Sequence, residues 1–373
     1  MTSEGSAGGP DPRWMREAIS EALKGRGRTH PNPCVGAVLV KEGVLLGKGY
    51  HHGPGTPHAE IEALREAGDA ARGADLYVTL EPCCTHGRTP PCTKALLEAG
   101  VARVFAAVED PNPGVAGKGA RELRSGGVSV EVGLLGAEGE AADPAYHHFY
   151  RAGRPFVHLK WAQTLDGAVR LPGGGYITGA EARERVHQER FLADAILVSA
   201  GTVVSDDPLL TVRLAGRSKP LVRVILDSRM QLTGAEGLFR TCPEEGPVWI
   251  VRPLGDDSET LTLKEGAEIL SLAAQASGGF DLAQVLARLR DRKVMYLYVE
   301  AVGRLSSAFL RERLVDRVSV HIAPVLAGGE KRPGALDGPL GEMRGMKLEG
   351  GELESAGRDW VFTASLEGRC LRD

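Results

Sequence analysis

The residues best suited to chemistry are one histidine, one glutamate and three closely spaced cysteines. His58 and Glu60 open the segment HAEIEALREAG, whose apolar residues have helical spacing. Cys83, Cys84 and Cys92 follow in EPCCTHGRTPPC. One histidine and two thiolates are a ligand set with which proteins hold a catalytic zinc ion, leaving its fourth position for water. We therefore expect a Zn²⁺ site in this part of the chain.

The spacing also suggests which residues bind the metal and which residue transfers protons. His58, Cys83 and Cys92 are the expected zinc ligands, while Glu60 would take a proton from water and pass it to a leaving amine. Zinc-dependent nucleobase deaminases have this pattern of His-x-Glu, then Pro-Cys, then a second Cys. Eight residues separate Cys83 from Cys92 instead of the usual two, and we expect this insert to shape the substrate pocket.

Two plainer interpretations compete with a catalytic zinc site. A structural zinc ion would be closed by a fourth protein ligand, for which Cys84 and His86 are available. Without the cysteines, His58 and Glu60 would be an ordinary helix start with a capping carboxylate. We expect Cys84 to be a packed neighbour, and the remaining cysteines to be ordinary thiols: Cys34, Cys242 and Cys370.

Composition restricts the class of protein. The 373 residues are 42% hydrophobic, enough for two ordinary domains, and the net charge of −4 argues against nucleic acid as a partner. No apolar run approaches the roughly 20 residues of a membrane helix. The opening MTSEGSAGGPDP resembles a disordered tail and lacks the features of a signal peptide, so we expect a cytoplasmic protein. The crowded cysteines do not resemble a disulfide framework.

The elements that position these residues alternate between strands and helices. The first segment has predicted strands at 35–40 and 44–50, which form a hairpin, and further strands at 75–81 and 103–109. Helices are predicted from His58, near 93–100 and near 120–126, which together indicate an α/β sandwich. The pattern weakens beyond GVSVEVG, and we place a domain boundary near Gly153, giving domains 1–153 and 154–373.

The second segment is another α/β unit. Strands are predicted at FVHLKWA, AILVSA, LVRVILD, VWIVR, VMYLYVE and RVSVHIAPV, with helices from Glu181, Asp281 and Arg304 and a closing pair of strands. A strand ends at Gly201, before a sharp loop at Asp206-Asp207-Pro208. No G-x-G-x-x-G follows a strand, so a Rossmann site is not indicated. Gly303 and the helix after it could meet a phosphate.

Four stretches of the first segment resemble a known family: HPNPCVGAVLV, GYHHGPGTPHAE, YVTLEPCCTHGRTPPC and VEDPNPGVAGKG. They are similar to the deaminase half of the bifunctional deaminase–reductases of riboflavin biosynthesis. The resemblance implies a cytidine deaminase-like α/β/α domain that removes the 2-amino group of a diaminopyrimidinone bearing a ribosylamino 5′-phosphate. It also implies that Asn32 and His51 line the substrate pocket; a turn residue and a surface strand end are the plainer alternatives.

The second segment resembles the reductase half of the same family through KWAQTLDG, YITG and GTVVSDDPLLTVR. The resemblance implies a dihydrofolate reductase-like fold and an NADPH-dependent reduction of the ribosyl side chain to a ribityl one. The implied substrate contacts are Gly174, Arg190, Leu210, Arg213 and Glu300. The implied NADPH contacts are Ala162, Tyr176, Thr202, Asp206, Ser228, Val302, Gly303 and Arg304.

One stretch departs from the family pattern. Members usually have a glycine-rich turn directly after the glutamate, whereas this chain reads VEAVGR, with Val302 where a backbone would approach a phosphate. A β-branched residue resists positive φ, and Gly303 could compensate by one position.

Family members form homo-oligomers, which we expect here too. A deaminase fused to a binding module, and a structural zinc domain fused to an interaction module, remain the alternatives.

Overall fold

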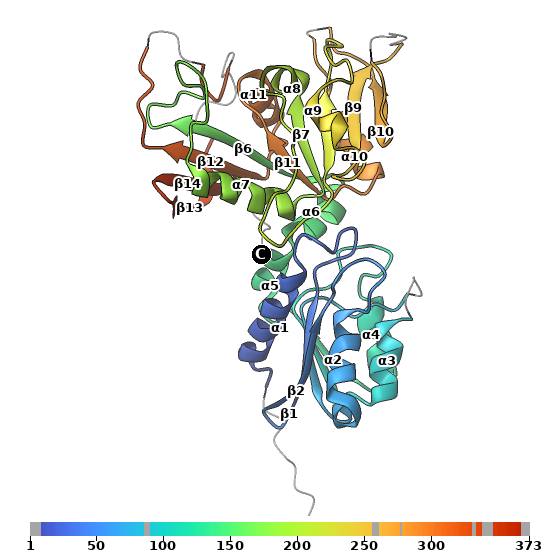
Figure 1. Cartoon of the computed structure of the whole chain (residues 1–373). Helices are drawn as coiled ribbons and strands as arrows, with labels where there is room; N and C mark the ends of the chain where they lie inside the picture. Colours follow the sequence, from blue (N-terminus) through green and yellow to red (C-terminus); the bar gives the residue numbers. More distant parts are fainter. Residues whose placement is uncertain are drawn as a thin grey trace, which may run out of the picture. The chain divides into compact units, whose positions relative to one another are not determined.

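The computed structural model describes residues 9–85, 90–255, 261–276, 278–329, 333–337 and 346–366. The chain divides into two compact units, Met1–Gly153 and Arg154–Asp373 (Figure 1). None of the helices in the described ranges is both long enough and apolar enough to span a membrane.

The described part of the first unit contains a five-stranded sheet in the order β2-β1-β3-β4-β5. Strand β1 pairs antiparallel with β2 and β3, and β3, β4 and β5 run parallel. The predicted hairpin is confirmed, with Glu42 and Gly43 at positive φ in its two-residue turn. The strands are β1 (Gly36–Lys41), β2 (Val44–Tyr50), β3 (Asp75–Val78), β4 (Arg103–Ala106) and β5 (Ser129–Val132).

Helices cover both faces of this sheet. Helices α1 (Pro12–Gly25) and α5 (Gly136–Ala142) lie on one face, and α2 (Ala59–Ala67), α3 (Cys92–Ala99) and α4 (Lys118–Ser125) lie on the other (Figure 1). A short 3₁₀ turn, Gly68–Ala71, follows α2, and α6 (Pro144–Ala152) ends the unit. The α/β sandwich predicted from the sequence is thus confirmed.

Two glycines bring α2 onto the sheet. A Cβ atom on Gly47 would lie 2.5 Å from the carbonyl oxygen of Ala63, and one on Gly49 would lie 2.7 Å from that of Ala59. No other residue type permits so close an approach of helix and strand. Because α2 begins directly after His58, this contact fixes the position of His58 and Glu60 relative to the sheet.

Two parts of the first unit differ from the sequence expectation. The tail was predicted to extend to Pro12, but Pro12 is the first residue of α1. Asp11 caps this helix by accepting a hydrogen bond from the Arg13 N–H. Residues 1–8 lie outside the described residues. The stretch in which the pattern weakens contains α5 and α6, with Asp143 as the N-cap of α6. An Asp followed by a Pro is an ordinary helix start, so this signal was available in both places.

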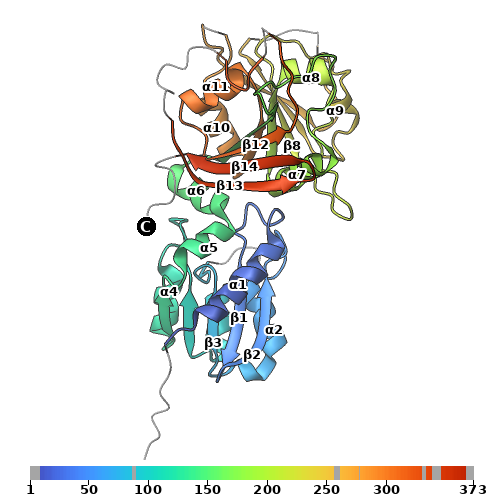
Figure 2. The same ribbon diagram turned by 90° about the vertical axis from the view of Figure 1, so that its left-hand side faces the viewer.

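The described part of the second unit contains a nine-stranded sheet in the order β10-β9-β8-β7-β11-β6-β12-β14-β13. From β10 to β12 all neighbours are parallel, and β14 and β13 close the sheet as an antiparallel pair, as predicted (Figure 2). The strands are β6 (Phe156–Thr164), β7 (Ala195–Ser199), β8 (Val222–Leu226), β9 (Val248–Pro253), β10 (Ala267–Leu272), β11 (Tyr296–Glu300), β12 (Arg317–Ala323), β13 (Leu348–Ala356) and β14 (Asp359–Leu366).

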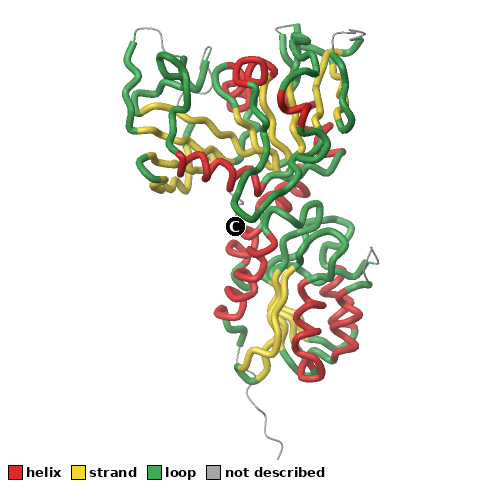
Figure 3. Tube along the Cα trace, viewed as in Figure 1, coloured by secondary structure: helices red, strands yellow, loops and turns green. Residues whose placement is uncertain are grey.

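The helices of the second unit follow the strands and pack against them (Figure 3). They are α7 (Ala180–Leu192), α8 (Ala200–Asp206), α9 (Gly237–Arg240), α10 (Leu282–Asp291) and α11 (Arg304–Arg311). The strand expected to end at Gly201 ends at Ser199, because the Ser199 hydroxyl caps α8 by accepting from the Thr202 N–H. The main core joins aliphatic residues of the parallel strands to α10 and α11.

Candidate active sites

The three expected metal ligands lie together in the first unit. His58 is the N-cap of α2, Cys83 lies in the loop after β3, and Cys92 is the first residue of α3. The ligand atoms all lie within 4.8 Å of one another, and Nδ1 of His58 is 3.2 Å from Sγ of Cys92 and 3.5 Å from Sγ of Cys83. Two helix starts and a strand end therefore converge on one point.

This arrangement fits zinc. A tetrahedral ion with bonds of about 2.1 Å to nitrogen and about 2.3 Å to sulfur separates those ligand atoms by roughly 3.6 Å. The distances from His58 Nδ1 to the two sulfurs are close to that value. Within the described ranges, Cys84 does not belong to the cluster, and His86 lies outside those ranges.

Burial and neighbouring charge shift the acidities at this site. The hydrogen bond between the two cysteines, together with His58, lowers the pKa of Cys83 to about 4. The same hydrogen bond and burial raise the pKa of Cys92. Glu60 is 3% exposed, and burial raises the pKa of its carboxyl to about 7. A carboxyl with such a pKa can both accept and release a proton near neutral pH.

A pocket opens beside these residues, lined by His58, Glu60 and Cys83 and also by Asn32 and His51. The Nδ2 of Asn32 lies 3.1 Å from Nε2 of His51, whose Nδ1 lies 3.1 Å from the carbonyl oxygen of Pro57. These partners assign the proton of His51 to Nδ1, which leaves Nε2 to accept from the Asn32 amide. Burial lowers the pKa of His51, in keeping with a neutral ring.

Several pocket residues were missed by reasoning from the sequence. Asp110 and Tyr146 line the pocket, and the Tyr146 hydroxyl donates to Asp110 Oδ1 at 3.1 Å. Burial raises the pKa of Asp110 to about 6. Glu81, also in the lining, accepts from the N–H groups of Gly117 and Ala120 at the start of α4. Asp110 lies in VEDPNP, part of a stretch that resembles the family, whereas Tyr146 has no local pattern around it that indicates a site.

The residues expected to contact NADPH gather where parallel strands end. Thr202 follows β7, Ser228 follows β8, and Val302 to Arg304 follow β11; Ala162 lies near the end of β6. These four strands are neighbours in the order β8-β7-β11-β6, so their carboxyl ends share one edge of the sheet. Ligands of open α/β sheets bind at that edge. Asp206, at the end of α8, is exposed and accepts a hydrogen bond from the Ser205 hydroxyl.

The residues expected to contact the substrate form a second group. The Arg190 Nε donates to Glu300 Oε1 at 2.6 Å, and its Nη1 donates to the Thr211 carbonyl at 3.0 Å. Arg213 Nη1 donates to the Thr211 hydroxyl at 2.9 Å, and Leu210 is buried with φ of 56°. Arg190, Leu210, Arg213 and Glu300 are thus brought together around one turn.

Gly174 and Tyr176 lie apart from that turn in the chain, in the loop between β6 and α7. Gly174 has φ of 80°, and Tyr176 is 78% exposed with the Arg183 guanidinium 4.6 Å from its ring centroid. After Glu300, Gly303 takes positive φ at 67°, whereas Val302 is not in that region and is exposed. The positive φ of this turn thus falls on Gly303, one position after Val302.

Two residues beside the substrate group were not predicted. His187, one turn before Arg190 on α7, accepts a hydrogen bond from the Arg213 N–H on its Nδ1 at 3.2 Å. Burial and the two arginines lower the pKa of His187 to about 4. Lys160 lies on β6 beside Glu300 of β11, and burial lowers the pKa of Lys160 while Glu300 opposes this effect. The helical spacing of His187 and Arg190 was the available signal.

Comparisons with known proteins identify both units. Residues 10–108 match the cytidine and deoxycytidylate deaminase zinc-binding region, and residues 155–362 match the RibD C-terminal domain. These matches confirm the expected fold class, a deaminase-like α/β domain followed by an α/β reductase domain.

Whole-chain relatives agree. The chain is 40% identical to the riboflavin biosynthesis protein RibD of Aquifex aeolicus (strain VF5), covering 94% of this chain and 97% of that protein. The corresponding protein of Escherichia coli (strain K12) is 40% identical, over 86% of this chain and 90% of that protein.

Solved structures give the same result. A structure of Acinetobacter baumannii RibD matches with a TM-score of 0.84 and 35% identity, covering 95% of this chain and 98% of that one. A Thermotoga maritima protein, described as a diaminohydroxyphosphoribosylaminopyrimidine deaminase/5-amino-6-(5-phosphoribosylamino)uracil reductase, matches with a TM-score of 0.82, 33% identity and the same coverage. The chain therefore belongs to the RibD family of bifunctional deaminase and reductase proteins of riboflavin biosynthesis.

Proposed function

We propose that residues 1–153 deaminate 2,5-diamino-6-ribosylamino-4(3H)-pyrimidinone 5′-phosphate, with His58, Cys83 and Cys92 as zinc ligands. A bound zinc ion would lower the pKa of water and so supply a nucleophile at neutral pH. Glu60 accepts the proton that the attacking water loses and passes it to the amino group, which leaves as ammonia. Asn32 offers the rest of its amide to the pyrimidine, while His51, whose two ring nitrogens already have partners, lines the pocket and orients Asn32.

The convergence of one nitrogen and two sulfur atoms beside a pocket supports this proposal most directly. A structural zinc site would need a fourth protein ligand. Among the described residues the cluster contains three, and the pocket lined by His58, Cys83 and Glu60 offers room for substrate. This observation favours a catalytic site over a structural one.

Residues 154–373, we propose, then reduce the ribosyl side chain at C1′ to a ribityl one. NADPH would supply the hydride, and the residues that would hold it are those expected from the sequence, most of them at the carboxyl ends of β8, β7, β11 and β6. Arg190 and Arg213 bind the 5′-phosphate through charge-assisted hydrogen bonds. Within the described ranges, Nη2 of Arg190 has no hydrogen-bond partner, so it can contact a ligand while Nε and Nη1 keep their partners.

The test is incubation with the diaminopyrimidinone phosphate, with and without NADPH, measuring ammonia and nicotinamide absorbance separately. Ammonia release should not require NADPH, whereas NADPH oxidation should require the deaminated product. A Glu60→Gln variant should keep its zinc and its fold while ammonia release falls about 10²- to 10⁴-fold. Normal ammonia release by this variant would contradict the assignment, and absent NADPH oxidation would leave a deaminase with an accessory module.

We infer a homo-oligomer acting in the cytoplasm on a small phosphorylated pyrimidine, without nucleic acid as a partner. The net charge of −4 supports the exclusion of nucleic acid. Light scattering in solution would test the oligomer.

A further inference from the structure

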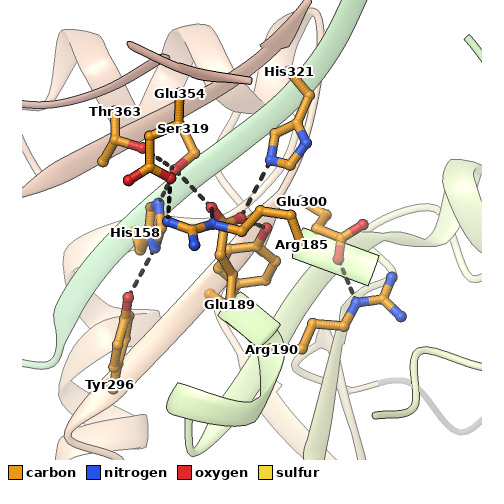
Figure 4. Close-up of polar contacts among 11 residues, drawn as sticks. His158, Arg185, Glu189, Arg190, Tyr296, Glu300, Ser319, His321, Glu354 and Thr363 are labelled. Carbon is orange, nitrogen blue, oxygen red and sulfur yellow. Dashed lines mark hydrogen bonds and ion pairs between the residues drawn. The ribbon is translucent and has the colours of Figure 1, made fainter. Parts of the chain in front are cut away.

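Glu189 of α7 carries a buried carboxylate on the side of the helix that faces the sheet. It is 5% exposed, although it adjoins Arg190 of the proposed substrate site. Its Oε2 accepts from the Tyr298 hydroxyl at 2.5 Å, and its Oε1 accepts from the Ser319 hydroxyl at 3.1 Å. Nε2 of His321 lies 3.4 Å from Oε2 (Figure 4). A buried carboxylate is costly unless it is hydrogen-bonded, and this one is.

The hydrogen bonds continue beyond Glu189 in one consistent direction. Because the Ser319 hydroxyl donates to Glu189, its oxygen accepts from Nε2 of His158, at 2.7 Å. The Nδ1 of His158 then accepts from the Tyr296 hydroxyl at 2.8 Å. Each donor has an acceptor when His158 is neutral and Glu189 is ionised. Among the described residues, Nδ1 of His321 is left without a hydrogen-bond partner. The other hydrogen bonds hold the members of the network in one arrangement.

This network joins one helix to several strands. Its members come from β6 (His158), β11 (Tyr298) and β12 (Ser319), and the Thr363 hydroxyl of β14 lies 3.3 Å from that of Ser319. Arg185, one turn earlier on α7, contributes a longer contact of 3.8 Å to Glu189. The carboxylate therefore ties one side of α7 directly to β11 and β12.

We propose that Glu189 is a positioning residue for the reductase, setting the rotation of α7 so that Arg190 meets Glu300 and Thr211. Successive residues of a helix point about 100° apart, because a turn holds 3.6 residues. A carboxylate held by three partners therefore also directs its neighbour. Figure 4 shows Arg190 and Glu300 paired to one side of the network. This inference rests on the proposed role of Arg190 in substrate binding.

The test is a double-mutant cycle with Glu189→Gln and Arg190→Lys in the full-length chain. Glutamine keeps the size of Glu189 but replaces one acceptor oxygen with an NH₂ donor. At least one of the groups that donate to Glu189 therefore loses its acceptor. The KM for the deaminated substrate should rise about tenfold, because a small misplacement of a binding group is costly. The KM for NADPH should not change. In the Arg190→Lys background, Glu189→Gln should have little further effect, since both changes act through one contact.

Controls separate positioning from loss of the fold. Glu184→Gln, on the exposed part of the same helix, should leave both KM values unchanged. The melting temperature of the second unit reports whether each variant is folded, and ammonia release by the first unit controls for the amount of intact protein. Should Glu189→Gln fail to fold, Tyr298→Phe provides a milder change that removes one donor of the same network.

Each outcome bears on a different claim. The positioning role would be overturned if Glu189→Gln raised the substrate KM equally in the wild-type and Arg190→Lys backgrounds. It would also be overturned if the KM for NADPH rose by the same factor. Either result would leave the proposed function standing. If Arg190→Lys alone leaves the substrate KM unchanged, the assigned role of Arg190 fails, and this inference fails with it. A rise in substrate KM that disappears in the Arg190→Lys background supports both.

Discussion

The hydrogen bond between Tyr146 and Asp110 links a pocket residue to a helix that follows the matched deaminase region. Besides the Tyr146 hydroxyl, Asp110 accepts from the Asn112 N–H. Both bonds stabilise the ionised carboxylate and oppose the rise in its pKa that burial causes. Tyr146 thus helps to keep Asp110 charged at neutral pH.

We expect Tyr146→Phe to lower kcat/KM of deamination by about two- to tenfold, the usual effect of one hydrogen bond. The pKa of Asp110, about 6, should rise further, because a bond to the charged form is lost. The acid side of the pH profile of kcat/KM should therefore move to higher pH. Reduction of deaminated substrate by the same variant is the internal control, and an unshifted profile would contradict this role.

His187 gives a second test at the level of one residue. Its Nδ1 accepts from the N–H of Arg213, which holds the turn that carries Leu210 at positive φ. Asparagine offers an acceptor near the position of Nδ1, whereas leucine offers none. His187→Leu should raise the KM for the phosphorylated substrate severalfold with little change in kcat, and His187→Asn should restore much of the loss. Equal KM values for the two variants would refute this role of the bond.

At the scale of elements, strands and helices with a strong apolar period could be predicted from the sequence, whereas α1, α5, α6 and β10 were not among the predicted elements. The hairpin and α2 could be predicted because their periodicities are local. Helix α6 was not predicted although Asp143-Pro144 is an ordinary helix start, because Tyr146 and His147, two of its four buried residues, depend on distant partners. The metal ligands could be predicted from types and spacing, whereas the contact of Tyr146 with Asp110 spans 36 positions and leaves no local pattern. The contacts of Glu189 likewise leave no local pattern, because Tyr298 and Ser319 lie 109 and 130 positions away.

The network beneath α7 makes the second unit sensitive to acid. Burial lowers the pKa of His158 to about 3, against about 6.5 in an unfolded chain. Between these values the unfolded state binds a proton that the folded state does not, so stability falls as pH decreases from about 6.5 toward 3. Glu189, with a pKa of about 2, adds a loss of the same sign below about pH 4.3.

We therefore expect the melting temperature of the second unit to decrease steadily between pH 7 and pH 5, a range in which Glu189 does not yet titrate. A His158→Gln variant should be less stable at pH 7 but should show a flatter dependence between these values. Amide hydrogen exchange of peptides from β6 and α7 would resolve this unit from the first. A wild-type melting temperature that is constant from pH 7 to pH 5 would show that His158 does not control the effect.

At the scale of the whole molecule, two compact units carry two chemistries that need different groups. The metal cluster and its pocket are built entirely from residues before Gly153, and the proposed reductase residues all follow Arg154. The two activities should therefore be separable by removing the metal. Chelation should abolish ammonia release, while NADPH oxidation with supplied deaminated substrate should stay within about twofold of its initial rate.

A Cys92→Ser variant offers the same separation without a chelator. Serine keeps the size of Cys92 but loses the thiolate, so zinc content should fall together with deamination. Its control is Cys242→Ser, a buried cysteine of the second unit that is outside the metal cluster. Because the cluster holds Cys83 and His58 near the start of α3, the first unit should also lose some thermal stability without metal. Loss of NADPH oxidation in Cys92→Ser would instead indicate that the metal site supports the fold of both units.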